Sequence, residues 1–65
     1  MRLKINGESM DCKADTVRAL LKELCINAPA VAVEVNFSIV SKKDFDTFAL
    51  KENDQVEIVN FVGGG

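Results

Sequence analysis

The chain has 65 residues, which is enough for one domain with a small hydrophobic core. Of these residues 48% are hydrophobic, and eight basic and ten acidic residues give a net charge of −2 at pH 7. This charge argues against binding to nucleic acid or to an acidic membrane surface, and no apolar stretch approaches the length of a membrane span or a signal core. Without histidine, and with only two cysteines, the chain offers no zinc pattern and lacks the commonest general base, which predicts neither a metal site nor catalytic residues.

The first expected elements are two strands joined by a tight hairpin. Apolar and polar residues alternate over residues 2–6, as in a half-buried strand, and Asn6-Gly7 is the strongest short signal for a hairpin turn. Residues 9–13 alternate again and place Met10 and Cys12 on one face. We therefore expect Cys12 to be a small apolar core residue.

A helix is expected next, because four apolar residues have the spacing of one helical stripe: Val17, Leu20, Leu21 and Leu24. Asp15 or Thr16 is the predicted N-cap, since either side chain can accept a hydrogen bond from a first-turn amide. Asn27 tolerates a left-handed conformation and Pro29 cannot continue a helix, so the helix should stop near Cys25 or the residue after it.

The two thiols are predicted to be structural rather than reactive. Cys12 and Cys25 form no CxxC motif, and the sequence identifies no cation that would lower the pKa of Cys25. Such sparse cysteines suggest reduced thiols and a cytoplasmic protein.

Alternation over residues 31–36 predicts a third strand whose core-facing residues are Val31, Val33 and Val35. A weaker pattern follows, in which residues 39–40 form a short extended segment and Ser41 caps a brief helical turn through Phe48. Three apolar residues are expected to close the end of the core: Phe45, Phe48 and Leu50.

The last strand, residues 55–62, follows a turn at Asn53-Asp54 and alternates imperfectly. If Val56 and Ile58 face the core, Val59 and Phe61 interrupt the polar face. This pattern indicates a central strand covered on both faces, an apolar patch reserved for a partner, or both.

Beyond residue 62 the sequence reads Gly63-Gly64-Gly65, which separates a domain at residues 1–62 from a flexible tail at residues 63–65. Glycine lacks a side chain, so the tail is a thin tether that fits a narrow channel and whose functional group is a terminal carboxylate. A frayed end or a cloning scar remains the alternative. A phosphate-binding loop is excluded because no helix follows the glycines.

The order of elements resembles the ubiquitin-like β-grasp group, and within it the ThiS family of sulfur carriers in thiazole formation for thiamine biosynthesis. The resemblance rests on Asn6-Gly7, Asp15-Thr16-Val17 before Leu20-Leu21, Val35-Asn36, residues 54–58 and Val62-Gly63-Gly64-Gly65. It implies an α+β fold, with a mixed sheet of about four to five strands and one main helix packed on one face. Asn53 stands where the family often has glycine, and asparagine can adopt the same left-handed turn.

The resemblance also implies a protein co-substrate rather than an enzyme. An adenylating enzyme of the ubiquitin-activating type (ThiF-like) would activate Gly65 with ATP and Mg²⁺, and sulfur from a donor such as a cysteine desulfurase would convert it to a thiocarboxylate. A ThiG-like thiazole synthase would receive that sulfur. Gly63 and Gly64 would thread the partner's active site, Val59, Phe61 and Val62 would form the docking surface, and the carrier itself would bind no cofactor.

Three alternatives remain from the sequence. A carrier for molybdopterin or another sulfur-containing product would use the same tail chemistry, although molybdopterin carriers tend to be longer. A ubiquitin-like binding module, or a modifier conjugated through its glycine carboxylate, would share the fold. An independent small enzyme is disfavoured by the missing histidine.

Overall fold

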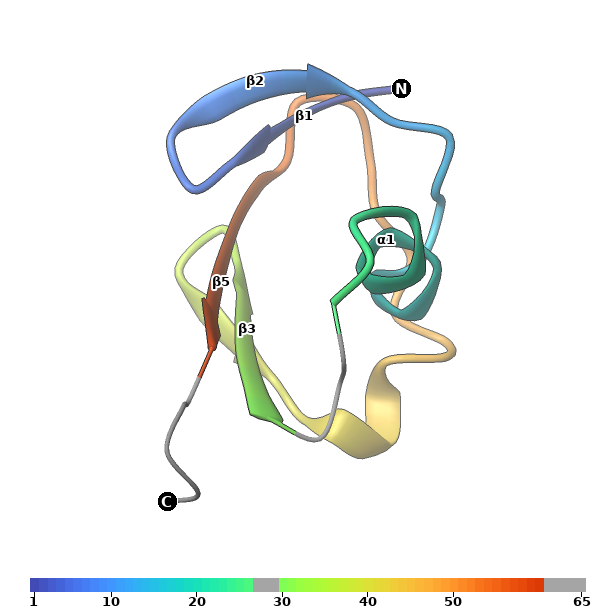
Figure 1. The fold of residues 1–65 in the computed structure, drawn as a ribbon, viewed down its shortest axis with the longest axis vertical. Coiled ribbons are helices and arrows are strands. Elements are labelled where there is room, and N and C mark those ends of the chain that lie inside the picture. The colour runs from blue at the N-terminus through green and yellow to red at the C-terminus, as the bar shows by residue number, and fades with distance from the viewer. Residues whose placement is uncertain (27–29, 61–65) are drawn as a thin grey trace.

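A single five-stranded sheet organises the computed structural model, which describes residues 1–26 and 30–60. The strands are β1 (Arg2–Ile5), β2 (Glu8–Asp11), β3 (Val31–Val35), β4 (Ser38–Val40) and β5 (Gln55–Asn60). Their order is β2-β1-β5-β3-β4, with β5 in the centre (Figure 1). β5 runs parallel to β1 and antiparallel to β3, and the other pairs are antiparallel. The predicted mixed sheet is confirmed.

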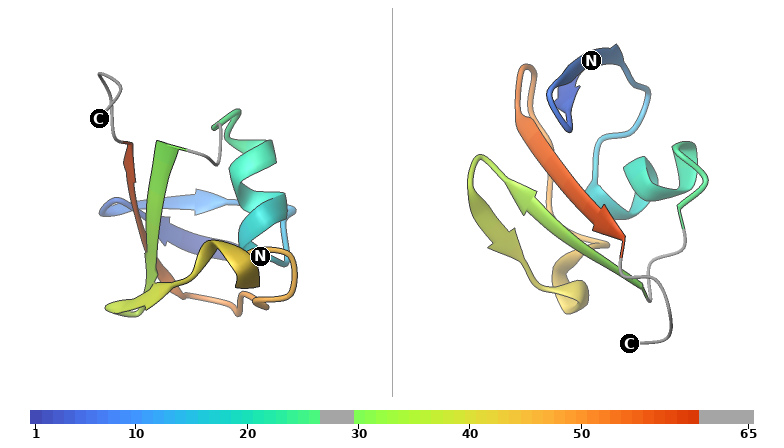
Figure 2. Two further views of the ribbon diagram at one scale, coloured as in Figure 1. Left: turned by 90° about the horizontal axis from the view of Figure 1, so that it is seen from below. Right: turned by 60° about the vertical axis from the view of Figure 1, so that its left-hand side comes forward.

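One helix, α1 (Val17–Glu23), lies on the concave side of this curved sheet (Figures 1 and 2). Its apolar stripe belongs to one core with the inward-facing side chains of the strands, which are Leu3, Ile5, Val31, Val33, Val35, Val40, Val56 and Ile58. Cys12 also belongs to this core, as predicted. The opposite face of β5 exposes Gln55, Glu57 and Val59, so the interpretation of a strand covered on both faces is wrong for the described residues.

Both hairpins turn through two residues with positive φ, as a type I′ turn requires. The predicted turn between β1 and β2 has φ of 48° at Asn6 and 85° at Gly7. The turn between β3 and β4, which the sequence pattern did not predict, has φ of 51° at Asn36 and 71° at Phe37. Type I′ turns match the twist of the flanking strands, which explains why both short connections take this form.

The two turn asparagines also fasten the hairpins to the central strand. Asn6 Oδ1 accepts a hydrogen bond from Ile58 N at 2.7 Å, and Asn6 Nδ2 donates one to the Ile58 carbonyl at 3.2 Å. Asn36 Oδ1 accepts from Gln55 N at 3.0 Å, and its Nδ2 donates to the buried carboxylate of Asp54 at 2.9 Å. Each amide thus extends the hydrogen bonding along β5 beyond the end of a neighbouring strand.

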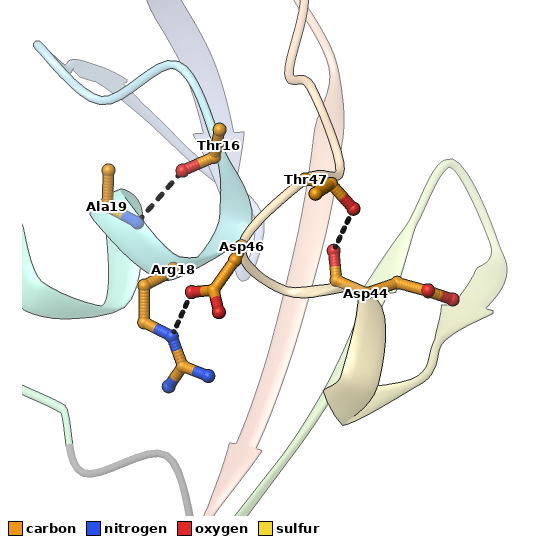
Figure 3. A network of polar contacts seen from close by, with 6 residues as sticks. All are labelled: Thr16, Arg18, Ala19, Asp44, Asp46 and Thr47. Atoms are coloured by element: carbon orange, nitrogen blue, oxygen red, sulfur yellow. Dashed lines mark hydrogen bonds and ion pairs between the residues drawn. The ribbon is translucent and has the colours of Figure 1, made fainter.

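The amides of the first helical turn all find acceptors. Thr16 is the N-cap, and its hydroxyl accepts from Ala19 N at 3.2 Å (Figure 3). Val17 N and Arg18 N donate to the Phe48 and Phe45 carbonyls at 3.2 and 2.9 Å. The alternative cap, Asp15, is therefore wrong, and the loop after β4 completes the helix start.

The helix ends slightly earlier than predicted, at Glu23, with Leu24 as its C-cap. Cys25 follows with a φ of 60°, and its amide donates to the Lys22 carbonyl at 3.1 Å. Ile26 N donates to the Leu21 carbonyl at 2.8 Å. These two bonds make a Schellman motif in which Cys25, not Asn27, takes the left-handed position; Asn27 lies outside the described residues.

The segment after β4 contains a short 3-10 helix, η2 (Lys42–Asp44). The expected side-chain cap from Ser41 is wrong, because Ser41 makes no capping hydrogen bond. The turn instead continues through the Asp44 carbonyl, which accepts from Phe48 N at 2.8 Å. Phe45 and Leu50 are buried and Phe48 packs against the core, as predicted, and Arg18 pairs with Asp46 at 2.8 Å (Figure 3).

Candidate functional site

The predicted site falls at the end of the central strand. Val59 lies near the end of β5 with its side chain 53% exposed on the uncovered face of the sheet. The other predicted site residues lie outside the described residues: Phe61, Val62, Gly63, Gly64 and Gly65. The structure therefore describes β5, the strand that precedes the glycine segment in the sequence.

β5 is hydrogen-bonded to a strand on each side, β1 and β3. β5 pairs with β3 over five residues, from Val31 opposite Asn60 to Val35 opposite Val56, and with β1 at Gln55 and Val56. The side chains of Asn6 and Asn36 add the hydrogen bonds described above. The strand is therefore fixed within the sheet as far as Asn60, its last residue.

The face around Val59 combines apolar and acidic side chains. Ala32 is the direct neighbour of Val59 across the β3–β5 pair. Glu34 lies opposite Glu57 on one side and opposite Ile39 on the other. Ile39 is 77% exposed.

Two exposed apolar residues were not identified as site residues from the sequence. Ile39 was assigned only to an extended segment, and Phe37, which is 78% exposed at the tip of the β3–β4 hairpin, received no role. The sequence did hold a signal, because Asn36, like Asn6, tolerates the left-handed conformation that the first position of a type I′ turn requires. The absence of glycine concealed this second hairpin.

The thiols differ in environment. Cys12 is buried, and this burial, followed by the nearby Glu23 carboxylate, raises the pKa of its thiol above the ordinary value. Cys25 is exposed at the helix end. Within residues 1–26 and 30–60, no three metal-ligating side chains gather into a possible metal site, and no helix is long and apolar enough to cross a membrane.

Comparison with known proteins shows to which protein family the chain belongs. The sequence model of the ThiS family matches residues 3–65. The chain is 37% identical over 65 residues to the sulfur carrier protein ThiS of Bacillus subtilis, covering 97% of this chain and 98% of that protein. It is also 47% identical over 66 residues to a thiazole synthase of Paramagnetospirillum magneticum, covering all of this chain but only 20% of that protein.

A solved structure shares the fold. The crystal structure of the thiamine biosynthesis protein ThiS from Geobacter metallireducens superposes with a TM-score of 0.84 at 35% identity, and the match covers both chains completely. The predicted β-grasp arrangement is therefore confirmed.

Proposed function

The chain belongs to the ThiS family of sulfur carriers in thiamine biosynthesis, and we propose that it carries sulfur as a thiocarboxylate on Gly65. The observation that carries the proposal is the family match, which extends through residue 65 and so includes the glycine segment. In this role the chain is a protein co-substrate, and the catalytic groups belong to its partners. Gly63 and Gly64 give the reacting carbonyl a thin approach to a partner's active site.

Loading needs activation, because an oxide is a poor leaving group from a carboxylate. A Gly65 carboxylate oxygen attacks the α-phosphorus of ATP, and Mg²⁺-bound pyrophosphate leaves, in the active site of a ThiF-like adenylating enzyme. The terminal sulfur of a persulfide, supplied by a donor such as a cysteine desulfurase, then displaces AMP. A second thiol reduces the resulting acyl disulfide and releases the thiocarboxylate. Because these steps use ATP and reduced thiols, we place them in the cytoplasm.

We propose a ThiG-like thiazole synthase as the acceptor of the sulfur. The chain spans 20% of the length of two thiazole synthases that it matches, so a segment similar to it occurs inside proteins of that name. Such a combination in one polypeptide favours a thiazole synthase over a molybdopterin enzyme as the consumer.

The test is the intact mass of the protein after incubation with ATP, Mg²⁺, a cysteine desulfurase with cysteine, and the purified adenylating enzyme. We expect a gain that matches replacement of one oxygen by sulfur, located at Gly65 by fragmentation. A variant lacking Gly65 is the control and should fold but remain unloaded. An unmodified Gly65, with an adenylating enzyme that loads another ThiS protein, would overturn the proposal and favour a binding module.

A further inference from the structure

The central strand β5 has a strand neighbour on both sides for only part of its length. β1 ends at Ile5, opposite Val56, whereas β3 continues beside β5 as far as Asn60. Within the described part of the chain, residues 57–60 therefore pair with β3 alone (Figure 1). The end of a strand with one neighbour opens more readily than a segment held between two strands.

The side chain of Asn6 takes the place of the missing continuation of β1. Asn6 N donates to the Val56 carbonyl at 2.9 Å, and at this point the chain leaves β5 for the hairpin turn. A longer parallel strand would next bond the amide and the carbonyl of Ile58 with its own backbone. Both of these groups bond the Asn6 side-chain amide instead, at 2.7 and 3.2 Å.

This contact lies at the end of β5 that is nearest in sequence to the reacting group. Ile58 stands two residues before the end of the strand, and Gly65 follows it by seven residues. A partner that binds the ordered strand end must first re-form it in every molecule in which it has opened. The apparent affinity then falls in proportion to the fraction of molecules that are ordered.

We propose that Asn6 is a positioning residue for sulfur loading, which holds the last residues of β5 in the sheet before the adenylating enzyme engages them. This inference rests on the function proposed above. Asn6 acts on the free carrier through Ile58, and the strand is re-formed in the bound complex. Loss of the Asn6 side chain therefore raises the KM for the carrier and leaves kcat unchanged.

Asn36 is the matched control, because it occupies the same turn position and holds the opposite end of β5. Its side chain bonds Gln55 N and the Asp54 carboxylate at 3.0 and 2.9 Å. This end of the strand keeps further backbone bonds without that side chain, since the Gln55 carbonyl accepts from Asn36 N at 2.7 Å and the Asp54 carbonyl from Lys4 N at 3.0 Å.

The first experiment measures the rate of thiocarboxylate formation against carrier concentration, with the adenylating enzyme, ATP, Mg²⁺ and a cysteine desulfurase with cysteine. Wild type is compared with Asn6→Gly and Asn36→Gly, because glycine accepts the φ of 48° or 51° and so preserves each turn. We expect Asn6→Gly to raise the KM about fivefold at unchanged kcat, and Asn36→Gly to keep the wild-type KM.

Asn6→Asp tests the hydrogen bonds themselves. Aspartate keeps an acceptor for Ile58 N and loses the donor to the Ile58 carbonyl, while it still tolerates positive φ. We expect an intermediate KM, about twofold above that of wild type.

Amide hydrogen exchange of the free carriers gives a readout that needs no enzyme. Residues 57–60 should exchange about tenfold faster in Asn6→Gly than in wild type and at the wild-type rate in Asn36→Gly. Asn36→Gly should melt at the same temperature as Asn6→Gly or lower, because it also removes a donor from the buried Asp54 carboxylate. A raised KM in Asn6→Gly alone then reports the position of the contact and not a general loss of stability.

An unchanged KM in Asn6→Gly, equal increases in both glycine variants, or unchanged exchange at residues 57–60 would each overturn the inference, while loading of wild type would still support the proposed function. Failure of wild type to be loaded at all would instead remove the proposed function, and this inference with it.

Discussion

Cys12 and Cys25 show how burial sets thiol chemistry at the scale of one residue. Cys12 lies in the core beside the Glu23 carboxylate, which itself accepts hydrogen bonds from Lys13 N and Ala14 N. Desolvation and this negative charge both disfavour the thiolate. Cys25 lies exposed at the end of α1.

We therefore expect iodoacetamide to alkylate Cys25 in the native protein and to spare Cys12, as read by mass spectrometry of peptides. Because the folded state holds the Cys12 proton to higher pH, its stabilising contribution is complete below the ordinary pKa of 9.0 and declines as the pH rises through the raised pKa. Urea unfolding of wild type and Cys12→Ala at increasing pH measures that decline. Equal alkylation of both thiols would contradict the assigned burial.

Asp54 is a buried carboxylate in a structural role. One oxygen accepts from Asn36 Nδ2 at 2.9 Å and the other from Lys51 N at 2.8 Å, so it joins the β3–β4 hairpin to the turn before β5. Its exposed fraction is 7%. The side-chain amide of Asn36 and the backbone amide of Lys51 therefore share the Asp54 carboxylate as their acceptor.

Replacing Asp54 with alanine leaves both donors without their partner and should lower the free energy of unfolding by about 2 kcal/mol. Urea denaturation measures the loss, and Glu8→Ala, on an exposed strand residue, is the control. A change no larger than in the control would show that water replaces the carboxylate without cost.

At the scale of elements, α1 is only seven residues long, too short to be stable alone in water, and depends on its ends. The N-terminal amides use the carbonyls of residues 45 and 48 and the Thr16 hydroxyl. The C-terminal end uses a Schellman motif with a cysteine where glycine is usual.

Cys25→Gly should therefore raise the free energy of unfolding by about 1 kcal/mol, because glycine reaches a φ of 60° without steric cost. Cys25→Ala is the matched control, since it removes the thiol and keeps the Cβ, and should change little. Thermal melting of the three proteins compares them. A less stable glycine variant would mean that the cysteine side chain itself supports the helix end.

At the scale of the whole molecule, one helix covers one face of the sheet, and β5 exposes its side chains on the opposite face (Figure 2). The central strand β5 contributes to both faces, since its inward side chains build the core and its outward side chains Gln55, Glu57 and Val59 are exposed. The same strand leads into the glycine segment.

If the tail is the sulfur carrier, replacing both Cys12 and Cys25 with alanine should leave the yield of thiocarboxylate unchanged. The measurement is the intact mass after the loading reaction, with circular dichroism to confirm that the double variant is folded. Loss of loading in the folded variant would move the chemistry from Gly65 to a thiol.

The sequence by itself determined the order and type of the elements, because residue spacing reports periodicity directly. The alternation in β1, β3 and β5, the stripe of α1 and the hairpin at Asn6-Gly7 are all local patterns, and each is confirmed. The fold class and family resemblance followed from those patterns together with the motifs. The role of Gly65 remains a prediction of chemistry.

Only the tertiary structure decided which residues face each other. The opposition of Glu34 and Glu57 depends on strand register, and the hydrogen bonds of Asn6 and Asn36 reach residues distant in sequence. The hairpin at Asn36-Phe37 is stable without glycine because flanking strand pairing and contacts to β5 hold it in a conformation that local propensity disfavours. Long-range pairing, which no single stretch of sequence displays, set both the make-up of the uncovered face and the exceptions to the local rules.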